Sequence, residues 1–210
     1  SGKSIFMDKI IYLIRHGKID LGNEKVYIGS TDIPLSSEGV QQSKLLKKYF
    51  ANIDIQKAYT SPLIRCVKTL DIILEDRNNI DRIYVKEFQE IDLGKWENKT
   101  FKYIKSHFPQ EYEERGKNID TFVPENGESF YQLQNRVMPI VNKILETKDN
   151  NILIVSHAGA NRVIISNLLK IPLKDIMGIY QPYACINKLF WNSKVKKWEY
   201  ELITMGEEVL

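Results

Sequence analysis

The sequence predicts an α/β protein of three layers, α/β/α, in which helices cover both faces of a mainly parallel sheet. Short apolar segments alternate with longer segments of helical periodicity along most of the chain, and this alternation is typical of βαβ units. Two final strands, 184–191 and 197–204, flank a turn at Asn192-Ser193 and predict an antiparallel hairpin at the sheet edge. With 210 residues the chain has the length of one domain, which we place at 7–210.

The first half of the chain supplies three of the expected strands. A buried strand over 9–14 is followed by a polar loop, and Ser36 or Ser37 is a suitable N-cap for a helix that runs to about residue 50. A second strand covers 55–60. Ser61-Pro62 then predicts an N-cap and a first helical position for a helix that ends near residue 76. The third strand is expected over 83–90.

The second half begins with a mixed aromatic and charged segment, 92–125, which predicts a helical insertion. Apolar residues at helical spacing predict a long helix over 128–146. A fourth, strongly apolar strand at 151–156 and a helix at 161–169 follow. Residues 1–6 are expected to be a cloning remnant ahead of a native start at Met7.

Composition and charge exclude several classes of protein. Lys and Arg number 30 against 27 for Asp and Glu, so the net charge of +3 is too small to indicate a nucleic-acid partner. The only cysteines, Cys66 and Cys185, form no CxxC pair, which fits a reducing compartment. No apolar run reaches the ~18 residues of a membrane helix, and the start of the chain lacks signal-peptide architecture. We therefore expect a cytoplasmic protein with no membrane partner.

Chemically active residues follow the predicted strands. The first strand ends in Arg15-His16, and Arg65 lies just after the second. Glu90 ends the third strand, and His157 follows the fourth. Because the carboxyl ends of parallel strands share one edge of a sheet, we expect these five residues to meet there. Two arginines and two helix N-termini at one edge favour an anionic ligand, and the arginine fork suits a phosphate group.

This set of residues predicts phosphoryl transfer in two steps. A histidine attacks phosphorus when its ring is neutral, and the nearby arginines Arg15 and Arg65 are expected to lower the pKa of His16. A phosphohistidine then forms on His16, and water takes the phosphoryl group. Arg15, Arg65 and His157 would hold the transferred oxygens, while Glu90 would protonate the leaving alcohol. Three neighbouring carboxyl groups are alternative proton donors: Glu87, Asp92 and Glu97.

A metal site that uses His16, His157 and Glu90 is the main chemical alternative. The adjacent arginines would repel Zn²⁺, and the sequence has no HxxH or HExxH spacing. We therefore expect neither a metal nor another cofactor.

Several motifs resemble one known family. Leu13-Ile14-Arg15-His16-Gly17 is similar to the signature of the histidine phosphatase superfamily, which is also called phosphoglycerate mutase-like. The similarity continues in order from residue 10 to about 162, and its further segments are 29–42, 61–69, 90–97, 127–136 and 155–159. The resemblance implies the phosphoglycerate mutase-like fold, with His16 as phosphoryl acceptor, a phosphate pocket of Arg15, Arg65 and His157, and Glu90 as proton donor.

The resemblance also implies phosphate contacts from the loop that follows the first motif. Asn23 and Gly29 are the equivalents of the family's asparagine and glycine in that loop. Ala158 stands where the family has a glycine, and we count it with the substrate-binding residues.

The short chain and the Tyr27-x-Gly29 loop resemble alpha-ribazole phosphatases and broad-specificity phosphatases of the family. The expected function is hydrolysis of a small phosphorylated metabolite, with alpha-ribazole 5'-phosphate as a candidate substrate. Two alternatives stay open: an isomerase of the phosphoglycerate mutase type, and a non-catalytic protein that binds a phosphorylated ligand. Nothing in the sequence indicates an oligomeric state.

Overall fold

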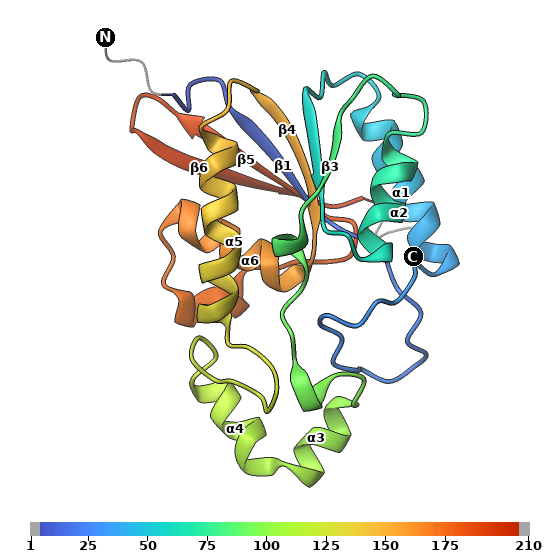
Figure 1. Ribbon diagram of the computed structural model, residues 1–210, viewed down its shortest axis with the longest axis vertical. Coiled ribbons are helices and arrows are strands. Elements are labelled where there is room, and N and C mark those ends of the chain that lie inside the picture. The colour runs from blue at the N-terminus through green and yellow to red at the C-terminus, as the bar shows by residue number, and fades with distance from the viewer. Residues whose placement is uncertain (1–4, 206–210) are drawn as a thin grey trace.

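A six-stranded sheet forms the centre of the computed structural model, which describes residues 5–205 (Figure 1). Its strand order is β3-β2-β4-β1-β5-β6. Four strands run parallel to one another: β1 (Ile10–Arg15), β2 (Lys57–Thr60), β3 (Arg82–Tyr84) and β4 (Asn151–Ser156). β5 (Ile186–Asn192) pairs antiparallel with β1, and β6 (Lys197–Ile203) pairs antiparallel with β5. The predicted fold class, a mainly parallel sheet with an antiparallel edge, is confirmed. The proposed remnant at 1–6 lies mostly outside the described residues, as does the end of the proposed domain at 206–210.

Helices cover both faces of this sheet. α1 (Ser37–Phe50) and α2 (Ile64–Ile73) pack on one face, and α5 (Phe130–Leu145) and α6 (Ala158–Leu169) on the other (Figure 1). The strands are apolar on both sides for this reason. In β1, Tyr12 and Ile14 join the core that contains Phe50 of α1, whereas Ile11 and Leu13 join the core that contains Val141 of α5.

The segment 92–125 contains two short helices, α3 (Phe101–His107) and α4 (Pro109–Lys117). They form a separate lobe below the sheet in Figure 1. Trp96 is fully buried and contacts the rings of Tyr27 and Phe122, with centroid distances of 5.0 and 5.4 Å. These aromatic contacts fasten the base of the lobe to the loop after β1.

Several predicted boundaries were wrong: α6 begins at Ala158 and not at residue 161, and two further differences concern the site. β3 ends at Tyr84, because the Val85 N–H makes the last bond to β2 and a 3₁₀ helix (Lys86–Phe88) then turns the chain away. Glu90 therefore follows this turn and does not end a strand. α2 begins at Ile64, not at Pro62, because Ser61 accepts the N–H of Leu63 while Asp32 accepts the N–H of Ile64.

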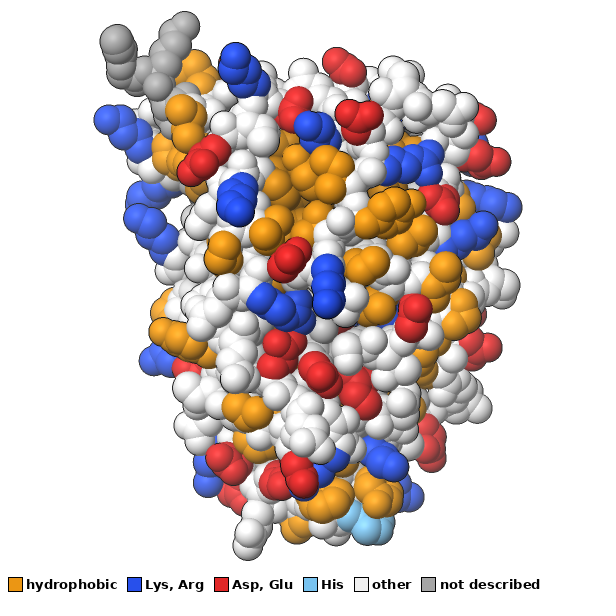
Figure 2. All heavy atoms as spheres, viewed as in Figure 1, with side chains coloured by type: hydrophobic (Ala, Val, Ile, Leu, Met, Phe, Trp, Pro, Cys, Tyr) orange, Lys and Arg blue, Asp and Glu red, His pale blue; other side chains and the backbone are white. Residues whose placement is uncertain are grey.

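Hydrophobic side chains gather in the upper half of the face shown in Figure 2. β3 is an edge strand of the sheet, and its Ile83 and Tyr84 are 36% and 58% exposed. Within residues 5–205 we find no helix with the length and hydropathy required to cross a bilayer.

Candidate active site

His16 lies just beyond the end of β1 and is buried. Its Nδ1 atom is 2.7 Å from the carbonyl oxygen of Gly17, and a carbonyl can only accept. The proton therefore sits on Nδ1, and Nε2 keeps its lone pair. Arg65 Nε donates toward Nε2 at 3.3 Å. This tautomer presents Nε2 as the nucleophilic nitrogen.

Two arginines are held beside this ring by backbone carbonyls. Arg65 Nη1 and Nη2 donate to the carbonyls of Thr31 and Gly29 at 2.5 and 2.6 Å. Arg15 Nη1 donates to the carbonyl of Gln181 at 2.6 Å, and its guanidinium lies 4.0 Å from the ring centroid of Tyr183. Arg15 Nε is buried and has no partner among the described residues, and neither arginine has a carboxylate within ion-pair distance there. Their positive charge is thus available to an anion.

His157 is the N-cap residue of α6, and its ring centroid lies 5.2 Å from that of His16. Its Nε2 atom is 2.8 Å from Ser61 Oγ, and the Cys66 thiol packs against the same ring. Burial, followed by the charges of Arg65 and Arg15, lowers the pKa of His16 well below its usual value, and burial and Arg65 do the same for the pKa of His157. Both rings are therefore neutral at pH 7. Burial lowers both pKa values more than the arginine charges do, whereas the sequence indicated only the arginines as a cause.

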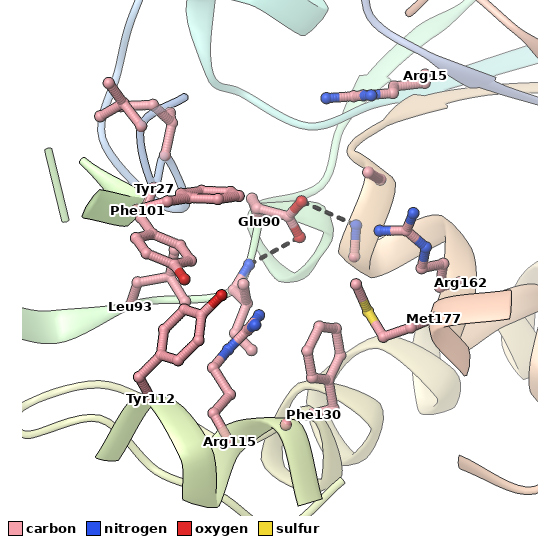
Figure 3. Close-up of a pocket in the computed structure, with 16 residues that line it drawn as sticks. Arg15, Tyr27, Glu90, Leu93, Phe101, Tyr112, Arg115, Phe130, Arg162 and Met177 are labelled. Atoms are coloured by element: carbon pink, nitrogen blue, oxygen red, sulfur yellow. Dashed lines mark hydrogen bonds between the residues drawn. The ribbon is translucent and has the colours of Figure 1, made fainter. Parts of the chain in front are cut away.

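Glu90 lies under the first turn of α6. Its carboxylate accepts the backbone N–H groups of Gly159 at 2.8 Å and Ile91 at 2.9 Å (Figure 3), and that of Ala160 at 3.1 Å. The positive end of the α6 dipole adds to these contacts. A Cβ atom on Gly159 would overlap the carboxylate, so a larger residue at this position would have to displace Glu90.

The backbone that carries Glu90 is held by Arg136 of α5. Arg136 donates to the carbonyls of Glu87, Gln89 and Glu90, and it pairs with Glu128 through two bonds of 2.6 and 3.2 Å. Glu128 also accepts the N–H of Asp92. The chain on both sides of Glu90 is therefore tied to the start of α5.

Glu97 anchors the loop that supplies partners to Arg65. Its carboxylate accepts the N–H groups of Gly29 and Ser30 at 3.0 and 2.8 Å, and the hydroxyl of Thr31 at 2.7 Å. It also accepts the N–H of Leu93. One side chain thus joins the loop after β1 to the turn before α3.

A cavity of about 420 Å³ opens beside Glu90 (Figure 3). Its walls carry aromatic rings from the loop after β1, from α3 and α4 and from the start of α5, namely Tyr27, Phe101, Tyr112 and Phe130. Arg15, Arg115 and Arg162 also line it, and Glu90 is the one carboxylate among the lining residues within the described chain. Arg15, which neighbours His16 in the chain, is thus shared with a space large enough for a small molecule.

A family model described as the histidine phosphatase superfamily (branch 1) matches residues 11–203. The chain belongs to this superfamily. It is accordingly an enzyme of a superfamily that acts on phosphorylated small molecules.

Known relatives of this histidine phosphatase differ in substrate. It is 25% identical to an adenosylcobalamin/alpha-ribazole phosphatase of Escherichia coli over 88% of this chain and 91% of the relative. It is 30% identical to a 2,3-bisphosphoglycerate-dependent phosphoglycerate mutase of Blochmanniella floridana, over 81% and 87%. The crystal structure of the alpha-ribazole phosphatase from Shigella flexneri superimposes with a TM-score of 0.83 and 24% identity, over 93% and 96% of the two chains.

The structure of this histidine phosphatase brings most of the predicted site residues to one place. Arg65 and His157 both lie beside His16, at 3.3 Å from its Nε2 atom and at 5.2 Å between ring centroids, while Arg15 and Glu90 line the cavity. Of the alternative acids, Glu97 is engaged by the loop, whereas Glu87 and Asp92 line a second cavity together with Glu90 and do not line this one. No three His, Cys, Asp or Glu side chains among residues 5–205 are arranged to hold a metal ion.

The other three predicted substrate-binding residues are two in the loop after β1, Asn23 and Gly29, and Ala158 after β4. Asn23 is exposed on a turn and does not line the cavity, so the structure does not bring it to the site. The Gly29 N–H already donates to Glu97 and its carbonyl accepts from Arg65, so its backbone holds the loop and the arginine. Ala158 opens α6 and lines the cavity.

Some residues of the site were not predicted. They include Glu97 in its role as loop anchor, Asp32 as the cap of α2, Ser61 beside His157, Tyr183 over Arg15, and the cavity arginines Arg115 and Arg162. Asp32, Ser61 and Glu97 stand inside the quoted motifs, but their partners lie 32 or more residues away along the chain. Only Arg115 and Arg162 could have been noticed in the sequence, because Arg115 lies in the segment 92–125 and Arg162 follows His157 by a few positions.

Proposed function

We propose that this histidine phosphatase hydrolyses a small phosphomonoester through a phosphohistidine on His16. The tautomer of His16 is the observation that carries the proposal. Its Nδ1–H is bound to the Gly17 carbonyl, and its Nε2 lone pair lies beside Arg65 in a pocket with a second arginine. A neutral, oriented imidazole in a cationic pocket is what attack on a phosphate ester needs.

The first step joins Nε2 of His16 to phosphorus and breaks the bond from phosphorus to the ester oxygen. Arg15, Arg65 and His157 would hold the three equatorial oxygens, where negative charge gathers. Glu90 would give its proton to the leaving oxygen, so that an alcohol departs. In the second step water attacks phosphorus, Glu90 takes a proton from that water, and the P–N bond breaks to release phosphate and restore His16.

Alpha-ribazole 5'-phosphate is the first substrate to test, since relatives at 25–28% identity are named for it. A mutase reaction is the second candidate, because a relative at 30% identity is a phosphoglycerate mutase and Arg115 and Arg162 line the cavity. In that reaction the phosphoryl group would return to another hydroxyl of the substrate in place of water.

Rapid quench with radiolabelled substrate tests the proposal. The quenched enzyme should carry an acid-labile, base-stable phosphoryl group, and His16→Ala should lose both this group and phosphate release. Free phosphate as the main product supports a phosphatase, and an isomerised phosphate ester supports a mutase. Full turnover by His16→Ala would overturn the mechanism, and binding without turnover in the unaltered protein would identify a non-catalytic binder.

A further inference from the structure

The segment 181–185, which leads into β5, contacts Arg15 in three ways. The Gln181 carbonyl accepts from Arg15 Nη1 at 2.6 Å, and the centroid of the Tyr183 ring lies 4.0 Å from the guanidinium carbon. The Cys185 carbonyl accepts the backbone N–H of Arg15 at 3.2 Å. The segment therefore holds this arginine at its backbone, at one guanidinium nitrogen and against an aromatic ring.

The same segment is a tight turn with one strained residue. The N–H of Cys185 donates to the carbonyl of Pro182 at 3.2 Å, and Ala184 is fully buried with a φ of +60°. A residue with a β-carbon rarely adopts this left-handed backbone, so the turn persists because its surroundings hold it. The N–H of Ala184 donates to the carbonyl of His16 at 3.0 Å, which ties the turn to the residue that follows Arg15.

Behind the turn, two buried amide side chains form a reciprocal pair. Gln181 Nε2 donates to Asn187 Oδ1 at 2.6 Å, and Asn187 Nδ2 donates back to Gln181 Oε1 at 3.0 Å. Asn187 Nδ2 also donates to the carbonyl of Leu13 at 2.9 Å. Since Leu13 lies in β1, the amide pair joins the turn to the strand that ends in Arg15.

Two further side chains complete the surroundings of this pair. The hydroxyl of Tyr200 in β6 donates to Asn187 Oδ1 at 2.8 Å. Burial raises the pKa of Tyr200 to about 12, so the hydroxyl keeps the proton that it donates. Asn161 of α6 donates to Gln181 Oε1 at 3.2 Å. Buried amides that are partnered in this way fix one arrangement of the chain around them.

Arg15 keeps nitrogen atoms available for an anion although the turn holds it. Within residues 5–205 its Nε atom is buried and unpartnered, and its Nη2 atom makes no hydrogen bond. Arginine binds phosphate through a planar fork, so the orientation of the guanidinium plane decides how many oxygens it can reach. The contacts with Gln181 and Tyr183 set that orientation.

We propose that Gln181 and Asn187 are positioning residues, which act through Arg15 on the phosphate group of the substrate. The inference rests on the proposed function, in which Arg15 holds oxygens of the transferred phosphoryl group. Neither amide lines the cavity beside Glu90. Their pairing fixes the backbone of residue 181, and the carbonyl of that residue fixes Arg15 Nη1. Without the pair, buried amide groups lose their partners and the strained turn can relax.

Asn187→Leu tests this inference, because leucine has the branched shape of asparagine and lacks the amide. We expect kcat/KM for 4-nitrophenyl phosphate to fall by about 10- to 100-fold, up to the cost of a ~1 Å displacement of a catalytic group. Inhibition by vanadate should weaken by a similar factor. Gln181→Met, which keeps the carbonyl that accepts from Arg15, should behave in the same way. Asn192→Leu is the matched control, since that side chain binds Glu199 and the hairpin turn at the opposite end of β5.

A double-mutant cycle separates positioning from a general loss of stability. In an Arg15→Gln background, Asn187→Leu should lower kcat/KM by less than about twofold, because the residue through which it acts is gone. An equal loss in both backgrounds would overturn the inference. If Asn187→Leu does not fold, Tyr200→Phe takes its place in the cycle. It removes one hydroxyl from the network and should lower kcat/KM by about 2- to 10-fold, the range for one hydrogen bond.

The proposed function is judged separately from the positioning role. Suppose that a phosphohistidine forms on His16, but Asn187→Leu matches Asn192→Leu in kcat/KM and in vanadate inhibition. The positioning role is then refuted, and the phosphatase mechanism stands. If no phosphohistidine forms, the proposed function fails, and calorimetric binding of inorganic phosphate decides the positioning role. Weaker binding to Asn187→Leu than to Asn192→Leu would support it, and equal affinity would refute it.

Discussion

The Oε2 atom of Glu90 accepts the backbone N–H of Gly159 at 2.8 Å, in the first turn of α6. A side chain at position 159 would displace this carboxylate, because a Cβ atom there would overlap it. His157 precedes Gly159 by two residues. The start of one helix therefore locates both the proposed proton donor and one of the proposed phosphate ligands.

Gly159→Ala is expected to displace the Glu90 carboxylate and to lower kcat/KM for an alkyl phosphate by about 100-fold, the cost typical of a displacement of ~1 Å in a catalytic group. Gly178→Ala is the matched control, since a Cβ atom there meets nothing within 4 Å. Steady-state kinetics of both variants, with circular dichroism to check folding, makes the comparison. Similar kcat/KM values for the two variants would contradict a fixed role for the carboxylate.

Glu90→Gln should slow substrates with poor leaving groups far more than activated ones, because only the former need a proton on the departing oxygen. The expected loss is about 10²–10⁴-fold for an alkyl phosphate and much smaller for 4-nitrophenyl phosphate. Measurement of kcat/KM for both esters checks this. Equal losses would indicate that Glu90 positions the phosphate, and no loss would move the acid role to another carboxyl group.

Glu97→Ala should destabilise the loop that holds Arg65. The N–H groups of Gly29 and Ser30 lose a charged acceptor, so we expect the free energy of unfolding to fall by about 2–4 kcal/mol. The value of kcat/KM should fall as well, because Arg65 donates to carbonyls of the same loop. Urea denaturation and kinetics test both effects, with exposed Glu114→Ala as the control. A variant as stable and active as that control would refute the anchoring role.

The two buried histidines predict how stability depends on pH. The pKa of each is well below 6.5 in the folded protein and returns to about 6.5 on unfolding. Below pH 6.5 the unfolded chain therefore binds more protons, and the free energy of unfolding falls as the pH falls, by up to about 1.4 kcal/mol per pH unit for each histidine. Urea denaturation between pH 7.5 and 5 should show this slope. The double variant His16→Asn/His157→Asn should show a flatter one, and equal slopes would contradict neutral buried rings.

Chelators should leave activity unchanged, because guanidinium groups supply the positive charge around the proposed phosphate site. Vanadate, which adopts the five-coordinate geometry of the transition state, should inhibit. Assays after dialysis against EDTA, with and without added Zn²⁺, make the test. Activity that is lost on dialysis and restored by zinc would reverse this expectation.

The sequence predicted those site residues that directly follow a buried strand. Arg15, His16 and His157 lie where β1 and β4 end, and strand position alone placed them at one edge of the sheet. Arg65 was predicted equally well although its helix starts later than expected, since a shift in the N-cap leaves the residue in the first turn. Glu90 was predicted as a site residue for a partly wrong reason, because a 3₁₀ turn and the Arg136 contacts bring it to α6.

Contacts between segments that are distant in the sequence could not be predicted from the positions of strand ends. Glu97 binds Gly29 across 68 positions of sequence, and no local pattern indicates which N–H groups a carboxylate will meet. Asn23 was expected to contact phosphate from its place in a motif, and this stays a prediction, since the fold shows it only as exposed on a turn. The partners of a loop depend on how α3 and α4 pack, and periodicity does not encode that packing.

The lobe built from α3 and α4 supplies Phe101, Tyr112 and Arg115 to the cavity, whereas Arg15, His16 and His157 come from the ends of strands. Under the proposed function, part of the surface that meets the leaving group therefore comes from a different stretch of polypeptide than the groups that meet phosphorus. A graft that exchanges residues 98–118 for the equivalent stretch of another superfamily member should transfer substrate preference and leave the chemical step intact. The fold offers protein engineers an exchangeable specificity module on a constant catalytic base.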